Sequence, residues 1–166
     1  MYLLYRQDGM RYPKYSRRIN KSRDKYSVEH TAITLNTGAE IVNGAYQGAQ
    51  VIVPSSNVQG MRKVKHLTLS MSLSPGTEST VLYWALVYVP QGYNPNTLNV
   101  QSASSFYEPN QNVMSCGLID PDAGPIRIRS VISRNLNSGD SIVLIVGTTL
   151  ASAVIRGVVK YAITLQ

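Results

Sequence analysis

Residues Leu67–Leu73 read LTLSMSL and residues Thr80–Val89 read TVLYWALVYV, and these two stretches decide the fold class. In the first, apolar and polar side chains alternate, which is typical of a β-strand with one buried face. The second is rich in β-forming residues and almost continuously apolar, which indicates a central strand covered on both faces. Residues 74–77 (SPGT) supply a turn between them. We therefore predict two consecutive strands of one β-domain.

The rest of the body repeats these patterns. Residues Ser141–Val146 predict another buried strand, and the last strand of the chain alternates, with Arg156 and Lys160 on its polar face. Residues Ser133–Asp140 are dense in turn formers and predict a loop. Further strand candidates are Ser27–Leu35, Gln50–Val53, Val100–Phe106, Asn112–Leu118 and Ile126–Arg129. No long amphipathic helix is visible, so short strands joined by polar loops predict an antiparallel sandwich or barrel.

Positive charge is concentrated at the N-terminal end of the chain. Residues 1–25 hold eight cations and two anions, a net charge of +6, whereas the residues after them hold eight cations and seven anions. Five of the eleven tyrosines lie in this segment or directly after it. The segment shows no helical period and has too little apolar area to fold alone. We predict a basic arm, residues 1–25, that orders only on a partner, followed by one domain, residues 26–166.

A basic arm beside a nearly neutral body indicates a polyanionic partner. Lys and Arg displace counterions from phosphates, and tyrosine rings can stack on unpaired bases at about 1–3 kcal/mol each. A solubilising tail or a nuclear-import signal has the same basic composition, but a solubilising tail does not need the tyrosines. We therefore predict that the arm binds nucleic acid. Its phosphate-binding candidates are Arg6, Arg11, Lys14, Arg17, Arg18, Lys21, Arg23 and Lys25, and its stacking candidates are Tyr2, Tyr5, Tyr12 and Tyr15.

The body carries a second set of candidate phosphate ligands. Arg62, Lys63 and Lys65 lie directly before the Leu67–Leu73 strand, and Arg127 and Arg129 share one face of the Ile126–Arg129 strand. For the last two, phosphate binding has about equal weight with the alternative interpretation, which is pairing between subunits or a solvated strand face.

Catalytic or metal-binding chemistry finds little support in the sequence. The two histidines, His30 and His66, belong to no recognisable catalytic set and are expected at the surface or in hydrogen bonds. The single cysteine, Cys116, excludes an intrachain disulfide and is predicted to be a small buried apolar side chain. Residues Asp120–Asp122 (DPD) offer two carboxylates to a cation such as calcium, but such a pair is more often turn chemistry. We expect no enzyme activity, no metal and no cofactor.

Six segments of the body carry a resemblance to a known family through their order along the chain. They are Arg62–Leu69 (RKVKHLTL), Trp84–Gly92 (WALVYVPQG), Asn94–Asn99 (NPNTLN), Tyr107–Val113 (YEPNQNV), Gly124–Ser130 (GPIRIRS) and Ser133–Asp140 (SRNLNSGD). The series resembles capsid proteins of small circular single-stranded DNA viruses that encode a replication initiator, the circovirus- and nanovirus-like group. The resemblance covers residues 27–166, while the arm matches in basic character only.

This resemblance implies both a fold and a function. The fold is a single jelly roll of eight antiparallel strands in two packed Greek-key sheets, behind the basic arm. The function is a capsid protein of which about 60 copies close a small icosahedral shell around single-stranded DNA, with the arm and a basic inner face toward the genome. The implied partners are other copies of the chain, the genome, host nuclear-import factors and a host surface receptor. The implied locations are the virion and the host nucleus or cytoplasm.

Two other functional classes stay open. A cellular module of barrel type that binds single-stranded nucleic acid would carry exposed aromatic and basic residues on its body, whereas here the body is nearly neutral. An enzyme or lectin-like domain can use the same sandwich, although the scarcity of acids and histidines weighs against an enzyme. The longest apolar run, Val81–Val89, is too short for a transmembrane helix, so we expect no membrane insertion.

Overall fold

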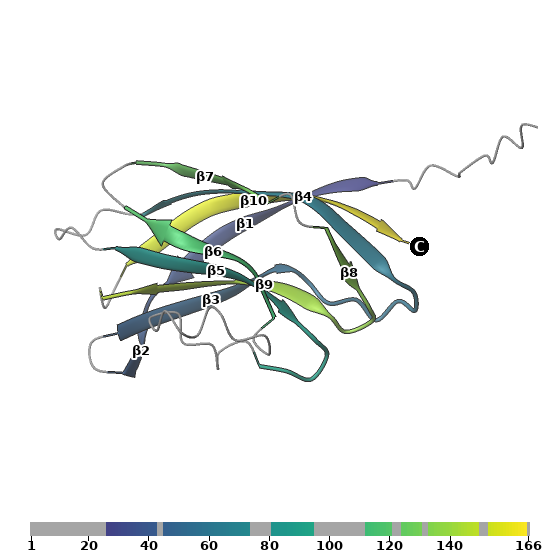
Figure 1. Ribbon diagram of the computed structural model, residues 1–166, viewed down its shortest axis with the longest axis horizontal. Helices are drawn as coiled ribbons and strands as arrows, with labels where there is room; N and C mark the ends of the chain where they lie inside the picture. The colour runs from purple at the N-terminus through teal and green to yellow at the C-terminus, as the bar shows by residue number, and fades with distance from the viewer. Residues whose placement is uncertain are drawn as a thin grey trace, which may run out of the picture.

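The computed structural model describes residues 26–42, 45–73, 81–94, 112–120, 124–130, 133–149 and 153–165. These residues form two antiparallel sheets packed face to face, and no helix occurs among them (Figure 1). The described chain therefore contains no helix that could cross a membrane. The basic arm, with its eight cations and four stacking candidates, and the predicted strand Val100–Phe106 lie outside the described residues. An all-β sandwich is confirmed for the part that the structure describes.

One sheet, here called sheet A, contains the first and the last strand as neighbours. Its strand order is β1-β10-β4-β7, and β8 also pairs with β4. The strands are β1 (Ser27–Asn36), β4 (Arg62–Leu73), β7 (Ile126–Arg129), β8 (Arg134–Leu136) and β10 (Val154–Leu165). The predicted long final strand is thus confirmed, and it lies inside the sheet between β1 and β4.

The other sheet, sheet B, has the order β2-β3-β9-β5-β6. Its strands are β2 (Ala39–Val42), β3 (Ala45–Val53), β5 (Leu82–Val89), β6 (Val113–Ile119) and β9 (Ser141–Thr148). Both faces of the central strands β5 and β9 are buried, as predicted from their continuous apolar runs. Leu86 and Leu144 point into the space between the sheets, and Ala85 and Ile145 belong to a second buried cluster on the opposite side.

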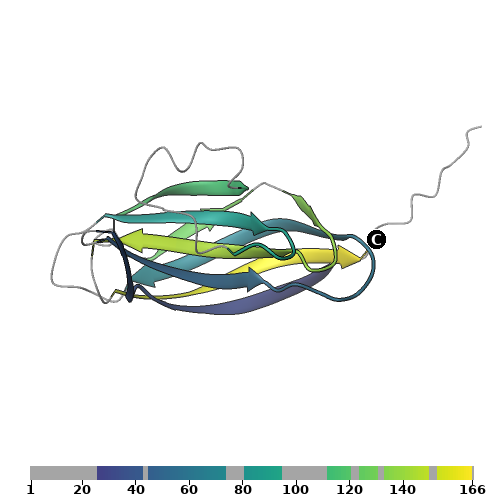
Figure 2. The ribbon, with the colours of Figure 1, turned by 90° about the horizontal axis from the view of Figure 1, so that it is seen from below.

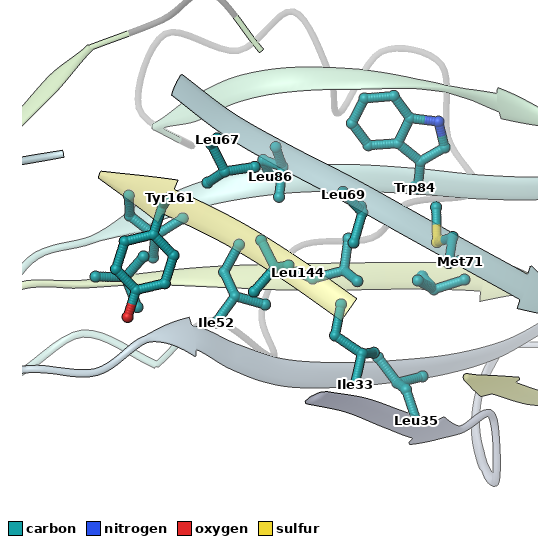
Figure 3. Close-up of a cluster of buried hydrophobic side chains, with 14 of the residues drawn as sticks. Ile33, Leu35, Ile52, Leu67, Leu69, Met71, Trp84, Leu86, Leu144 and Tyr161 are labelled. Atoms are coloured by element: carbon teal, nitrogen blue, oxygen red, sulfur yellow. The ribbon is translucent and has the colours of Figure 1, made fainter. Parts of the chain in front are cut away.

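The main core lies between the two sheets (Figure 3). The alternation predicted for Leu67–Leu73 is confirmed, because Leu67, Leu69 and Met71 are buried while Ser70 and Ser72 are exposed. Burying side chains of this size stabilises the fold by about 1.5–3 kcal/mol each. Trp84 and Tyr161 contribute the largest rings to this core from opposite sheets.

A β-bulge interrupts the pairing of β4 with β10. Thr68 lies opposite Lys160 and Lys65 lies opposite Ala162, so that two residues of β4, His66 and Leu67, face a single residue of β10. His66 has a φ of 55°, outside the usual strand region. The bulge shifts the alternation by one residue, and side chains before it point inward at even numbers and after it at odd numbers.

Two predictions about the loops need correction. The basic triplet at 62–65 does not precede the strand but forms its first third, because β4 begins at Arg62. Within the predicted loop Ser133–Asp140, residues Arg134–Leu136 form β8, which pairs with β4 and buries Leu136 completely. This pairing is a tertiary contact that no local pattern announces, and the turn follows it at residues 138–139.

The strands run along the length of the sandwich, so the loops gather at its two ends (Figure 2). At one end the loops at 54–61, 90–94 and 137–140 are tied together by hydrogen bonds. Gly139 N–H donates to the carbonyl of Ser56, and Gln91 N–H donates to the carboxylate of Asp140. The start of β1 and the end of β10 pair with each other near this end.

Candidate nucleic-acid interface

All eight Lys and Arg residues that follow the arm lie on strands of sheet A. Three are on β4, two on β7, one on β8 and two on β10, and the strands of sheet B contain none. Although the net charge of the body is nearly neutral, its cations are therefore concentrated on one of the two sheets. A fold that places these strands in one sheet converts scattered cations into one electropositive surface.

Six of the eight cations point away from the core. Their strand neighbours Val64, Ile126, Ile128, Ile155 and Val159 pack into the core, so the cations next to them face the other side of the sheet. We call this outward surface of sheet A the cationic face. It contains Lys63, Lys65, Arg127, Arg129, Arg156 and Lys160, together with His30 of β1.

The strand register places these side chains in rows across the sheet. His30 lies opposite Lys160, Lys160 opposite Thr68, and Thr68 opposite Arg129, which makes one row over all four strands. In the neighbouring rows, Ser70 lies opposite Arg127 and Ser72 opposite Arg156. Because neighbouring strands are about 4.8 Å apart, cations and hydroxyls alternate at close spacing. Both groups donate hydrogen bonds to phosphate oxygens.

No carboxylate opposes this charge on the described strands of sheet A. Glu29 is the only acidic residue in them, and it occupies an inward position opposite Tyr161. The hydroxyl of Tyr161 donates to Glu29 Oε2 at 3.0 Å. Burial, and then this hydrogen bond, raise the pKa of Tyr161. The negative charge of Glu29 is therefore engaged on the other side of the sheet from the cationic face.

The described chain begins on the cationic face. Tyr26 directly precedes β1, and Lys65 Nζ lies 4.8 Å from the centroid of its ring. Such a cation–π contact at an exposed site stabilises by about 0.5–1 kcal/mol. Residue 25, the last residue of the basic arm, is joined to Tyr26. Tyr26, to which the arm is joined, thus lies on the same side of the molecule as the six cations.

Arg62 is a correction to the predicted phosphate ligands. Its side chain points inward from β4 ahead of the bulge and is only 7% exposed. Nη1 donates to the carbonyl of Pro54 and Nη2 to the carbonyl of Asp140, each at 3.1 Å. The guanidinium is therefore a buried cross-link between two loops and β4 and is not available to a phosphate.

Asp140 is the centre of a second buried group at the same end. Its carboxylate accepts hydrogen bonds from the Tyr88 hydroxyl at 2.6 Å, from Asn137 N–H at 2.8 Å and from Gln91 N–H at 3.2 Å. Burial by itself raises the pKa of Asp140, but these donors together outweigh it and hold the pKa below its ordinary value. Burial and the bond to Asp140 raise the pKa of Tyr88. Arg134 lies opposite the inward-facing Val64, and its guanidinium carbon lies 4.2 Å from the centroid of the Tyr88 ring. This cation therefore does not belong to the cationic face.

The remaining candidates are placed as follows. Cys116 was predicted to be buried and is exposed, because β6 is an edge strand and turns this residue outward. His66 is exposed at the bulge. Among the described residues, no group of three or more His, Cys, Asp or Glu side chains could hold a metal ion. Asp122, the second carboxylate of the DPD loop, lies outside the described residues.

The candidate phosphate ligands predicted on the body include Lys63, Lys65, Arg127 and Arg129, and the structure brings these four onto one face. It adds Arg156, Lys160 and His30, which the candidate set lacked. The alternation of the last strand predicted that its two cations share one side. The sequence pattern did not predict the strand order, in which β10 lies between β1 and β4.

A comparison of the chain with models of known protein families finds no match, and a comparison with curated proteins finds no significant relative. The functional assignment therefore depends on the geometry and charge of the chain itself.

Proposed function

We propose that this chain is a viral capsid protein that assembles with itself into a small icosahedral shell and packages single-stranded DNA. The observation that carries the proposal is the separation of charge between the two sheets. Every cation beyond the arm lies on sheet A, and Tyr26, to which the arm is joined, contacts Lys65 of the cationic face. The cations of the arm and those of the cationic face can therefore bind the same polyanion.

We also infer that the sandwich is a jelly roll. Its antiparallel pairs are nested in the sequence: β1 with β10, β3 with β9, β4 with β7 and β8, and β5 with β6. A long hairpin rolled into two sheets produces this nesting and makes the first and last strands neighbours. The two short strands β2 and β8 are additions to the eight strands that such a roll requires.

The charges suit a shell that encloses a nucleic acid. About 60 copies with a net arm charge of +6 bring on the order of 360 positive charges to one side, and the six cations of the cationic face add about as many again. The strands of sheet B carry no cation, and Glu40 is their only acid. A body with so few charges outside one face suits a subunit whose other surfaces bury against neighbours.

A cellular module for single-stranded nucleic acid is the runner-up and receives less support. Such modules stack bases on aromatic side chains of their strands. The described strands of sheet A have no Phe, Tyr or Trp at an outward position, and Tyr26 directly before β1 is the one tyrosine ring that contacts a cation of this face. A face of cations and hydroxyls contacts the sugar–phosphate backbone and does not read bases, as packaging of a whole genome requires.

Sedimentation of the purified full-length chain at physiological salt tests this proposal. The expected result is a particle of megadalton size that contains nucleic acid, measured as the absorbance ratio at 260 and 280 nm across the sedimenting boundary. Protein that sediments as a monomer or small oligomer and carries no nucleic acid contradicts the proposal. A small oligomer with bound nucleic acid favours the runner-up.

A further inference from the structure

Among the described strands, the two sheets have four edges, one of them formed by β7 and β8 together, and three of the four carry protective features. Unprotected edges present unpaired N–H and C=O groups to other chains. On β1 the Gln50 side chain occupies part of the edge, since its Oε1 accepts from Thr34 N–H at 3.0 Å and its Nε2 donates to the carbonyl of Ala32 at 3.1 Å, and the exposed polar residues Glu29 and His30 lie nearer the start of the strand. The edge strands β7 and β2 have only four residues each, and β7 carries two arginines while β2 carries Glu40 and a register shift.

The fourth edge, β6, has none of these protections. It has seven residues, Val113–Ile119, without a charge and without a proline, and among the described strands it pairs only with β5. Two of its side chains, Cys116 and Leu118, are exposed, and Leu118 is 64% exposed. A long, uncharged edge with an exposed leucine is the kind that pairs with another strand.

We propose that β6 pairs antiparallel with β6 of a second copy of this chain, around a two-fold axis at Gly117; this inference rests on the proposed self-assembly. The register follows from the irregular end of β6. The pairing with β5 shifts between Leu86 and Val87, which disturbs Val113 and Met114 and leaves Ser115–Ile119 regular. Gly117 is the middle of that regular part. Cys116 of each copy then faces Leu118 of the other on the outward side of sheet B.

A second copy fits this edge better than an unrelated segment does. The edge of an antiparallel strand is complementary to itself around a two-fold axis, because the axis repeats every N–H···O=C hydrogen bond of one half of the strand pair in the other half. With no charged residue in β6, the two copies bring no like charges together. The contact also covers the exposed leucine of each copy with the cysteine of the other.

The single cysteine of the chain makes this register measurable. The two Cys116 side chains become diagonal neighbours across the axis, with Cβ atoms about 7–8 Å apart. A short bis-maleimide added to the assembled full-length protein should therefore link them into a covalent dimer as the main product. The matched control is the double variant Cys116→Ser/Val158→Cys, which moves the thiol to the exposed Val158 of the cationic face. It should give roughly tenfold less dimer, because the two thiols are no longer held at a high effective concentration.

A second variant tests the edge without moving the thiol. Leu118→Lys places a charge on an exposed position of the edge and should reduce the cross-link of Cys116 by a similar factor. The proposal is wrong if the wild-type chain gives no more dimer than the Val158 control, or if Leu118→Lys cross-links like wild type. Large particles without this cross-link refute the edge pairing alone, whereas a monomer without nucleic acid refutes the proposed function as well.

Discussion

Removing two cations from one row of the cationic face should weaken nucleic-acid binding in a way that salt reveals. Arg129 and Lys160 lie in the same row, on either side of Thr68. The double variant Arg129→Gln/Lys160→Gln keeps two hydrogen-bonding side chains of similar length and removes two charges. Both residues are exposed, so the fold should tolerate the change.

The size of the effect follows from counterion release. For a single strand, the slope of log K against log salt changes by about 0.7 for each phosphate contact, so losing two contacts lowers the slope by about 1.4. Between 50 and 200 mM salt, this makes the affinity of the variant fall roughly sevenfold less than that of the wild type. At physiological salt, the same relation predicts an affinity loss of roughly tenfold.

The assay is fluorescence anisotropy of a labelled single strand, titrated with the full-length chain at a series of NaCl concentrations. The matched control is Val58→Asp/Val81→Asp, which lowers the net charge by the same amount at two exposed positions off the strands of sheet A. The control should keep a slope close to that of the wild type. If both double variants change the slope equally, only the total charge matters, and the cationic face has no special role.

Three further predictions test the arm and the packing. Deleting residues 1–25 should leave a folded β-domain that packages less nucleic acid, seen as a lower 260/280 nm ratio in the sedimenting fraction; equal packaging contradicts the role of the arm. Asp140→Asn should lower the free energy of unfolding by about 1–3 kcal/mol. Because the pKa of Asp140 is lowered, its contribution is present above about pH 4 and lost below it, so urea unfolding of the variant should depend less on pH between pH 5 and 2. Gly157→Ala should destabilise by about 1–3 kcal/mol, since the new Cβ would overlap the Ser70 carbonyl and lie 2.9 Å from Met71 Cα, whereas Gly38→Ala, with open space around it, should not.

Local sequence patterns were sufficient to predict the long strands, whose side chains are either continuously apolar or alternate between apolar and polar. The apolar runs of β5 and β9 and the alternation of β4 and β10 report burial directly, because each depends only on which face of its own strand is covered. The bulge was also visible in principle. Val64 and Leu67 are both inward residues three positions apart, and this change of phase marks an extra residue in the strand.

The features that were missed depend on which strands become neighbours. The strand β8 exists because residues 134–136 pair with β4, and the predicted turn chemistry of that segment gave no sign of it. Cys116 was predicted to be buried because it lies in a strand and free cysteines are usually buried, but β6 lies at an edge of the described sheet and this residue is exposed. Arg62 was grouped with Lys63 and Lys65 by sequence alone, although the strand period separates its side from theirs. The cationic face itself arises from strand order, which joins residues 30, 63–65, 127–129 and 156–160.

Cross-linking of bound DNA to the full-length chain tests the central claim most directly. Single-stranded DNA that contains bromodeoxyuridine would be bound, irradiated and digested, and the attached peptides would be identified by mass spectrometry. Cross-links should map to residues 1–25 and to the outward positions of β4, β7 and β10. Cross-links that map instead to exposed residues of sheet B, such as Ala49 and Val51 of β3 and Leu118 of β6, would contradict the assignment of the cationic face to the nucleic acid.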